Sequence, residues 1–495
     1  MEAALLLFPK AAIGIAVMLA LVLDSLAPGR ARRNLIVATV VLLTVGAVVA
    51  AVGIGRSASF MDGALVVDRY SIFSDIVLLA LGALVTLAAL DSVGSSSDAG
   101  DFHVLLYLSL GGASVLASAG NLIVVFLAIE LAIIPTFALV AFRADDRRSF
   151  EAALKYFLLS VFASAVLLFG LSLIYGSTGS VRLPPGTEVV GSNMLLIGVA
   201  LVLVGFGFKL AAFPFHQWLP DAFEVSHPEV AAFLAVGPKL AAVVALVRIL
   251  EGLTALSGAW TAAVAGVALL TMLWGNLGAF RQTRLPRLLA YSAIAHAGYA
   301  LVGLAGGGAP GMDGAVVYFA AYSAAALGAF LVVAMLTRDG FGDRLSDLRG
   351  LGRRRPLLAA AMSIFMVSMI GVPLFAGFWG KFSVFLGAIE GGLVWLAVAG
   401  VLNSAMSFGY YGNVIRLMYF GDAEGEFAAS GEPDALGEPA AQGERGALGE
   451  RGVAAPARQR AWGQRLALGA AVVLTLLLGI VPSLLFGALG VSSGF

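Results

Sequence analysis

Three lysines and a glutamate lie inside long apolar stretches of this sequence, where an ionisable side chain is costly. Lys209, Lys239 and Lys381 each interrupt such a stretch, and Glu130 lies within the apolar run that begins at Asn121. A charged side chain at the centre of a bilayer costs roughly 2.5–3.5 kcal/mol on insertion scales, so its presence there indicates a function. Side chains that gain and lose a proton in the lipid interior can relay protons or ions. The residue types therefore predict a proton or ion pathway.

Two of the lysines stand beside features that break a helix. Pro214 follows Lys209 by five residues, and Pro373 precedes Lys381 by eight. Proline removes a backbone donor and clashes with the preceding turn, so we expect an interrupted helix at both places. Irregular backbone at membrane depth is tolerated only where protein or a water-filled cavity satisfies it. The alternative for Lys209 is a lysine that snorkels to the interface, which the apolar residues on both sides of it disfavour.

His296 and Lys155 are further candidates for the same chemistry. His296 lies in the segment LLAYSAIAHAGYALVGL, where Tyr291, Ser292 and Tyr299 are its helical neighbours. These hydroxyl groups could form a hydrogen-bonded chain with the imidazole, although a lone histidine on an apolar helix is usually a satisfied polar group. Lys155 lies near the expected start of a membrane-spanning segment, so snorkelling and function are both open.

The composition excludes a soluble protein. Of the 495 residues, 60% are hydrophobic and 12% are charged, whereas about 25% of the residues of a soluble domain are charged. Cysteine is absent, which excludes an iron–sulfur cluster or a thiolate zinc site within this chain, and we predict no metal site. The net charge of zero argues against a nucleic-acid partner. We therefore expect an all-α polytopic membrane protein, because the periodicity is not that of a β-barrel.

Apolar runs of about 20 residues, the length that crosses a bilayer, recur along the chain. We expect about fourteen membrane-spanning helices, of which the seventh and the twelfth are broken. Their ranges are 4–26, 34–55, 71–90, 103–119, 121–142, 152–175, 192–218, 228–250, 259–280, 286–306, 314–337, 357–388, 393–420 and 464–489.

Basic residues set the orientation of these runs. Arginines cluster after odd-numbered runs, as at Arg143, Arg147 and Arg148 after the fifth, whereas Lys10 is expected on the opposite side. The positive-inside rule then places both termini on the outer side of the membrane. Residues 421–463 are rich in Gly, Ala, Glu and Pro, and we predict that they form a flexible cytoplasmic insert.

The two lysine-bearing broken helices are separated by five helices, which indicates an internal repeat. Because five is odd, the second unit would be inverted relative to the first, as in transporters with an ion site near mid-membrane. The predicted divisions are 1–100 (helices 1–3), 101–252 (helices 4–8, first repeat), 253–420 (helices 9–13, inverted repeat), 421–463 (insert) and 464–495 (helix 14).

Four segments carry a resemblance to a known family. They are DRRSFEAALKYFLLSVFASAVLLFGLSLIYGSTGS (146–180), GFKLAAFPFHQWLPDAF (207–223), LLAYSAIAHAGYALVGL (288–304) and GVPLFAGFWGKFSVF (371–385). On these segments the chain resembles the subunit N family of bacterial proton-pumping NADH–quinone oxidoreductase, respiratory complex I. The resemblance covers nearly all of residues 100–420 and implies inverted repeats with broken helices 7 and 12. Lysine rather than glutamate at position 381, and an end soon after the last helix, argue against two sister subunits.

The resemblance implies a site, partners and a location. Protons would move along a mid-membrane chain, while FMN, the iron–sulfur clusters and quinone would be held by partner subunits, with no cofactor in this chain. The partners would be other complex I subunits, especially neighbouring antiporter-like and small membrane subunits, in a bacterial inner membrane with both termini periplasmic. The proton-transfer positions of the family match Glu130, Lys209, Lys239, His296 and Lys381, and less certainly Lys155.

One turn departs from the family, and two other classes of function are open. Residues 224–229 read EVSHPE in place of a Gly-Ala-Pro-Thr-like turn. His227 could take up protons there, although a plain helix start is the interpretation we favour. A subunit of a multisubunit cation/proton antiporter or membrane-bound hydrogenase would show sodium-dependent activity without NADH. In a non-enzymatic scaffold, loss of the lysines would harm assembly alone.

Overall fold

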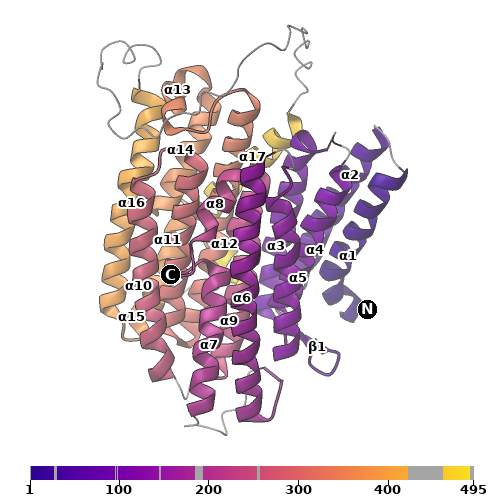
Figure 1. The fold of residues 1–495 in the computed structure, drawn as a ribbon, viewed down its shortest axis with the longest axis vertical. Coiled ribbons are helices and arrows are strands. Elements are labelled where there is room, and N and C mark those ends of the chain that lie inside the picture. The colour runs from indigo at the N-terminus through magenta and orange to yellow at the C-terminus, as the bar shows by residue number, and fades with distance from the viewer. Residues whose placement is uncertain are drawn as a thin grey trace.

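Long helices that run nearly parallel to one another make up almost the whole molecule (Figure 1). The computed structural model describes residues 2–26, 30–94, 96, 98–143, 146–183, 193–253, 257–421 and 461–490. Most of the predicted insert 421–463 lies outside these residues. Continuous helices are the expected result of such apolar runs, because a helix satisfies its backbone hydrogen bonds within the segment.

The described residues form the following elements, in chain order. The first part contains α1 (Glu2–Leu26), α2 (Arg30–Val52), β1 (Ala58–Phe60), β2 (Leu65–Val67), α3 (Arg69–Ser92), α4 (Ala99–Ala117), α5 (Leu122–Val140), α6 (Arg147–Thr178), α7 (Asn193–Leu210), α8 (Trp218–Val225) and α9 (Pro228–Glu251). The second contains α10 (Ser257–Phe280), α11 (Leu285–Gly306), α12 (Gly308–Arg338), η3 (Leu345–Leu348), α13 (Leu351–Arg354), α14 (Pro356–Ile370), α15 (Ala376–Glu390), α16 (Val394–Phe420), α17 (Trp462–Ile480) and α18 (Ser483–Leu489).

The helices agree with the predicted membrane-spanning runs. Within the described residues, 12 helices are long and apolar enough to cross a membrane, and each coincides with a predicted run. The two remaining runs are 357–388, which forms the 15-residue helices α14 and α15, and 393–420, which forms the 27-residue α16. The chain is therefore a multi-pass helical membrane protein, as predicted, while the full count of spans stays a prediction.

The structure differs from the sequence prediction at three places. A short hairpin joins α2 to α3, in which β1 and β2 pair antiparallel, so the chain is not purely helical. Most of the predicted joint 219–227 is helical, since it contains all of α8 but Trp218. The last predicted run, 464–489, is divided into α17 and α18 with Pro482 as the N-cap of α18, because proline cannot continue the hydrogen-bonding of the preceding helix.

The centre of the bundle is α9. All of its membrane-length window is buried, and α3, α4 and α12 pack around it. A helix that is apolar on all sides belongs inside a bundle, and α9 has this character apart from a few charged residues. At the periphery, α1, α2, α6 and α17 are only 28–39% buried, and α6 exposes apolar side chains such as Phe162 and Leu168. Lys239, which lies on α9, is therefore among the most enclosed charged residues of the molecule.

Two interruptions lie at the expected prolines. Residues 211–217 separate α7 from α8, and residues 371–375 separate α14 from α15. In the first, Ala211 adopts φ of 55°, and in the second, Gly371 adopts φ of 92°. Such left-handed conformations end α-helices and favour glycine. A side chain at 371 would also be crowded, because a Cβ there would lie 2.9 Å from Cδ of Lys381.

Candidate functional site

Lys209 lies in the last turn of α7, and its amino group faces α5 and α6. Nζ donates to Ser160 Oγ at 3.0 Å and to Ser164 Oγ at 2.9 Å, and lies 3.7 Å from Glu130 Oε1. Ser164 donates to the same carboxylate oxygen at 2.5 Å. The lysine is 4% exposed, whereas the Glu130 side chain is 22% exposed. The structure thus places a buried amine beside a carboxylate, with one hydroxyl group in contact with both.

Helix α6 supplies both hydroxyl groups, because residues four apart share one helix face. The backbones of α6 and α7 approach closely: a Cβ on Gly170 would lie 2.8 Å from Gly198 O, and a Cβ on Gly205 would lie 2.6 Å from Leu167 Cβ. Small residues allow such close packing of helices in lipid. This approach brings the amine of Lys209 within hydrogen-bonding distance of α6.

The interrupted backbone after Lys209 is satisfied by protein groups. The Phe213 N–H donates to Thr271 Oγ1 of α10 at 3.0 Å, and the Ala212 N–H donates to Gly207 O at 2.8 Å. Thr271 is fully buried. These bonds meet the requirement that non-helical backbone at membrane depth find its partners inside the protein.

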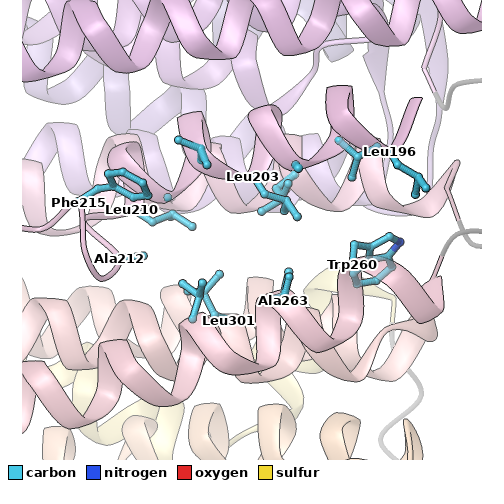
Figure 2. A pocket seen from close by; sticks show the side chains of 15 residues that line it. Leu196, Leu203, Leu210, Ala212, Phe215, Trp260, Ala263 and Leu301 are labelled. Atoms are coloured by element: carbon cyan, nitrogen blue, oxygen red, sulfur yellow. The ribbon is translucent and has the colours of Figure 1, made fainter. Parts of the chain in front are cut away.

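An apolar cavity of about 430 Å³ borders the other side of α7 (Figure 2). Figure 2 shows Leu196 and Leu203 of α7 facing Ala263 of α10, with Trp260 towards one end and Phe215 towards the other. The side chains of the wall are aliphatic or aromatic, and the Trp260 N–H donates to Leu253 O at 3.2 Å. Such a lining offers no group that could relay a proton. The polar chemistry of Lys209 therefore lies on the α5–α6 side.

Lys239 is enclosed in the middle of α9. It is 1% exposed, and Nζ donates to Ala293 O of α11 at 3.4 Å. Within the described part of the chain, no ion pair of 4.0 Å or less involves this amine. Ala293 precedes His296 by three residues, about one helical turn. The charge of Lys239 thus has no adjacent counter-ion, and its amine contacts the helix that carries the histidine.

His296 lies at the centre of a group of hydroxyl side chains. Nδ1 is hydrogen-bonded to the Tyr318 hydroxyl, and Nε2 lies 3.1 Å from the Tyr411 hydroxyl, which is hydrogen-bonded to Ser292. Its ring stacks on Tyr322, with 4.2 Å between centroids. The prediction that His296 forms a hydrogen-bonded chain with neighbours on its own helix is therefore wrong about the direct partners of the imidazole. The tyrosines come from α12 and α16, and Ser292 joins through Tyr411.

Lys381 lies on α15 and reaches back across the second interruption. It is 4% exposed, and Nζ donates to Ile370 O at 2.8 Å and to Ser404 Oγ at 2.7 Å. Ile370 ends α14, so the amine caps a helix C-terminus, where the helix dipole favours a cation. Nζ also lies 4.6 Å from the Tyr299 ring centroid, and that ring lies 5.9 Å from the His296 ring. Lysine and histidine therefore share one aromatic neighbour.

Lys155 lies at the surface near the start of α6. Its side chain is 52% exposed, and Nζ lies 2.7 Å from Glu151 and 3.5 Å from Asp221. Arg287 also pairs with Asp221, at 2.9 Å. Exposed ion pairs of this kind contribute little to stability. Lys155 therefore lies at the protein surface, and none of its ion pairs involves Lys209.

His227 occupies the N-cap position of α9, directly before Pro228. Its ring packs edge-on against Phe102 and Phe142, with centroids 6.3 and 6.2 Å away. Burial, with a smaller contribution from the positive charge of Arg143, lowers the pKa of His227 to about 4. The imidazole is therefore neutral near pH 7, which favours a helix start over proton uptake.

One buried ion pair escaped the sequence prediction. Nζ of Lys10 lies 2.7 Å from Asp75 Oδ2, and the lysine side chain is 11% exposed. Ser114 donates to the same carboxylate at 2.5 Å. Both charged residues lie within predicted apolar runs, and this position could have indicated that they form a pair. The pair links α1 to α3, and its charges compensate each other.

The predicted interior proton-transfer residues form two clusters. Glu130 and Lys209 make up the first, and α11 connects Lys239, His296 and Lys381 in the second. Six side chains complete these clusters and were not predicted, although Ser160 and Ser164 carry an i, i+4 signal. They are Ser160, Ser164, Tyr318, Tyr322, Ser404 and Tyr411.

Comparisons of sequence identify relatives over most of the chain. The family model described as NADH:quinone oxidoreductase/Mrp antiporter, TM matches residues 119–407. The NADH-quinone oxidoreductase subunit N of Trichlorobacter lovleyi is 39% identical over 430 residues, which cover 85% of this chain and 88% of that protein. Subunit N of Desulfovibrio desulfuricans is 42% identical over 379 residues, covering 72% of this chain and 75% of that protein.

Solved structures agree with these relatives. A chain of respiratory complex I from Thermus thermophilus superposes with a TM-score of 0.77 at 30% identity, covering 97% of this chain and 99% of that chain. A chain of the Mrp complex from a Dietzia species gives a TM-score of 0.81 at 24% identity, covering 99% and 96%, which shows a shared fold. This chain belongs to the NADH:quinone oxidoreductase/Mrp antiporter family and, within it, to the subunit N group of NADH-quinone oxidoreductases.

Proposed function

We propose that this chain is a proton-translocating membrane subunit of NADH:quinone oxidoreductase. The observation that carries the proposal is the contact among Glu130, Ser164 and Lys209, in which a buried amine and a carboxylate share a hydroxyl group. A hydroxyl group both donates and accepts, so it can connect two groups that exchange a proton. The relatives named NADH-quinone oxidoreductase subunit N support the assignment.

The contact can act as a switch because its two charges compensate each other. With Glu130 ionised at 3.7 Å, the protonated amine of Lys209 has a counter-ion in an apolar interior. When the carboxylate moves away or takes a proton, the buried ammonium loses that compensation and its proton is released. Movement in neighbouring subunits would supply the change in distance.

The α11 cluster would carry the proton further. Lys239 contacts α11 one turn from His296, whose ring nitrogens are hydrogen-bonded to the hydroxyl groups of Tyr318 and Tyr411. Lys381 lies against Tyr299, the neighbour that it shares with His296. Such interacting groups titrate together rather than one by one. We assign proton transfer to Glu130, Lys209, Lys239, His296 and Lys381, and a surface role to Lys155.

The redox reaction would take place in partner subunits. This chain contains no cysteine and so has no thiolate ligand for an iron–sulfur cluster. FMN, the clusters and quinone would belong to other subunits, and this chain would serve the complex as a translocase component. Neighbouring antiporter-like and small membrane subunits are the proposed partners, and the exposed apolar side chains of α6 offer a surface for packing in lipid.

We further propose an inner-membrane topology with both termini periplasmic. The two interrupted helices support the division into a first repeat, 101–252, and an inverted repeat, 253–420. Basic residues such as Arg284 and Arg287 would lie on the cytoplasmic side with α8.

Lys209→Met in the assembled enzyme tests the function. Methionine keeps a long side chain but cannot carry a proton, so we expect at least an approximately tenfold loss of proton translocation. The measurement is NADH-driven acidification of proteoliposomes, with co-purification as the check on assembly. Glu390→Gln, at an exposed carboxylate that ends α15, is the control and should pump normally. Undiminished translocation at normal turnover in the lysine variant would overturn the proposal.

The source of energy distinguishes the antiporter alternative from the proposed function. Sequence identity to the subunit N relatives favours NADH oxidation as that source, whereas the likeness to the Mrp complex is one of fold alone. Proteoliposomes that exchange sodium for protons without NADH would support the alternative.

A further inference from the structure

Glu229 is a buried carboxylate that the proposed proton chain does not use. It lies in the first turn of α9, the helix that carries Lys239, and it is 0% exposed. Oε1 accepts a hydrogen bond from Gln464 Nε2 at 3.2 Å, whereas Oε2 is buried without a hydrogen-bond partner among the described residues. Buried polar groups almost always have partners, and an ionised carboxylate without them is costly. Stability alone does not explain a carboxylate here.

A single side chain separates Glu229 from the solvent-exposed rim of the bundle. Gln464 of α17 is 1% exposed, and its Oε1 accepts from Arg338 Nη1 at 3.3 Å. Its backbone N–H donates to Asp91 Oδ2 at 2.9 Å. Arg338 is exposed at the end of α12, and Asp91 is partly exposed near the end of α3. Gln464 therefore links the carboxyl group to two charged rim residues, Arg338 of α12 and Asp91 of α3.

The charges around this end of α9 are mixed in sign. Arg338 and Asp91 of the rim, which both contact Gln464, carry opposite charges. His227 precedes the glutamate by two residues, and the positive charge of Arg143 acts on its imidazole. Charged or titratable groups on neighbouring elements include His103 on α4, Glu224 on α8 and Arg33 on α2, whose guanidinium lies 5.1 Å from the Trp462 ring centroid.

A structural tie between α9 and α17 is the competing explanation. Such a tie needs an acceptor for the Gln464 amide, and glutamine at position 229 would provide one as well. The carboxyl group adds one property that an amide lacks, the ability to take and release a proton at Oε2.

We propose that Glu229 is a proton-carrying residue at the cytoplasmic end of α9, an inference that rests on the function proposed above. A hydronium ion at the rim loses a proton and becomes water, while an O–H bond forms on Oε2 and the carboxylate becomes a carboxylic acid. That O–H bond then breaks, an N–H bond forms on the neutral amine of Lys239 to give the ammonium, and the carboxylate is restored. The lysine lies ten residues along the helix, about 15 Å away, so water molecules carry the proton across the interval.

Glu229→Gln in the intact complex, reconstituted into proteoliposomes, tests the inference. The amide preserves the bond to Gln464 but holds no transferable proton, so we expect an approximately tenfold loss of NADH-driven translocation. Glu229→Asp should recover part of the translocation. Lys209→Met and Glu390→Gln, measured in the same assay, are the positive and negative controls. Normal pumping in Glu229→Gln while Lys209→Met fails would overturn this inference alone; normal pumping in both would overturn the proposed function.

Gln464→Leu provides a second test if Glu229→Gln does not assemble. Leucine removes the hydrogen bond to Oε1 and leaves the carboxyl group in place. The inference expects the pH dependence of translocation to shift relative to the unchanged chain, because one hydrogen bond to the ionised form is lost. A structural tie expects reduced assembly with an unchanged pH dependence, and that outcome would overturn the inference.

Discussion

The amino groups of Lys209 and Lys381 both lie beside an interrupted helix, but their partners differ in charge. Lys209 has a carboxylate at 3.7 Å and two serine hydroxyl groups. Lys381 is held by the carbonyl of Ile370 and the hydroxyl of Ser404, and within the described residues it forms no ion pair. One interruption is thus built around a counter-ion, and the other around the C-terminus of a helix.

The difference separates two ways to hold a proton in an apolar interior. A carboxylate stabilises an ammonium strongly, yet it can itself take up a proton or move. A carbonyl at a helix end stabilises the cation less, and it stays charge-neutral throughout. The charge of Lys209 therefore depends on a neighbour that can change state, whereas the charge of Lys381 depends on groups that cannot.

Removal of the Glu130 carboxylate should give the largest effect, because it removes the charged partner that distinguishes Lys209 from Lys381. Glu130→Ala leaves the ammonium of Lys209 buried without a counter-ion, which costs about 3 kcal/mol. We expect a lower unfolding temperature of the purified complex and a loss of proton translocation. Glu390→Ala, at the exposed end of α15, should change neither quantity. A stable, pumping Glu130→Ala complex would show that Lys209 does not depend on the carboxylate.

Loss of a single hydroxyl group should affect the two lysines unequally. Ser404→Ala removes one of the two hydrogen bonds of Lys381, and we expect a loss of about 2 kcal/mol because the donor is charged. Ser160→Ala should cost about 1 kcal/mol or less, since Ser164 and Glu130 still contact Lys209. Thermal unfolding of the two complexes measures the difference. The opposite order would mean that the carboxylate is not the main partner of Lys209.

The sequence predicts the lysines and the interruptions well, because both depend on local chemistry. Proline at 214 and 373 acts on the turn that precedes it, and an ionisable residue in an apolar run is visible without any contact information. The last run was predicted as one helix but forms α17 and α18, and the cause is again a proline, Pro482. The segment is apolar throughout, so this break was not predicted.

The partners of the lysines and of His296 depend on packing between distant helices. Tyr411 is separated from His296 by 115 residues, and Ser164 from Lys209 by 45. A helical pattern shows which residues share a face, but it does not show which helix lies against that face. The same reason explains why the contact of Lys10 with Asp75 was not predicted.

Substitution of His227 should give the smallest effect. It tests whether the turn between α8 and α9 takes up protons, in addition to the contacts of Lys209. Its pKa of about 4 is below the ordinary value of 6.5, so the folded protein binds this proton less readily than the unfolded chain. Its stabilising contribution is therefore complete above pH 6.5 and is lost as the pH falls towards 4. His227→Gln should leave turnover and translocation unchanged above pH 6.5 and make the complex less sensitive to acid below it. Reduced translocation at neutral pH would instead assign proton uptake to this histidine. The first interruption would then differ from the second in two features, the Glu130 carboxylate and the turn that contains His227.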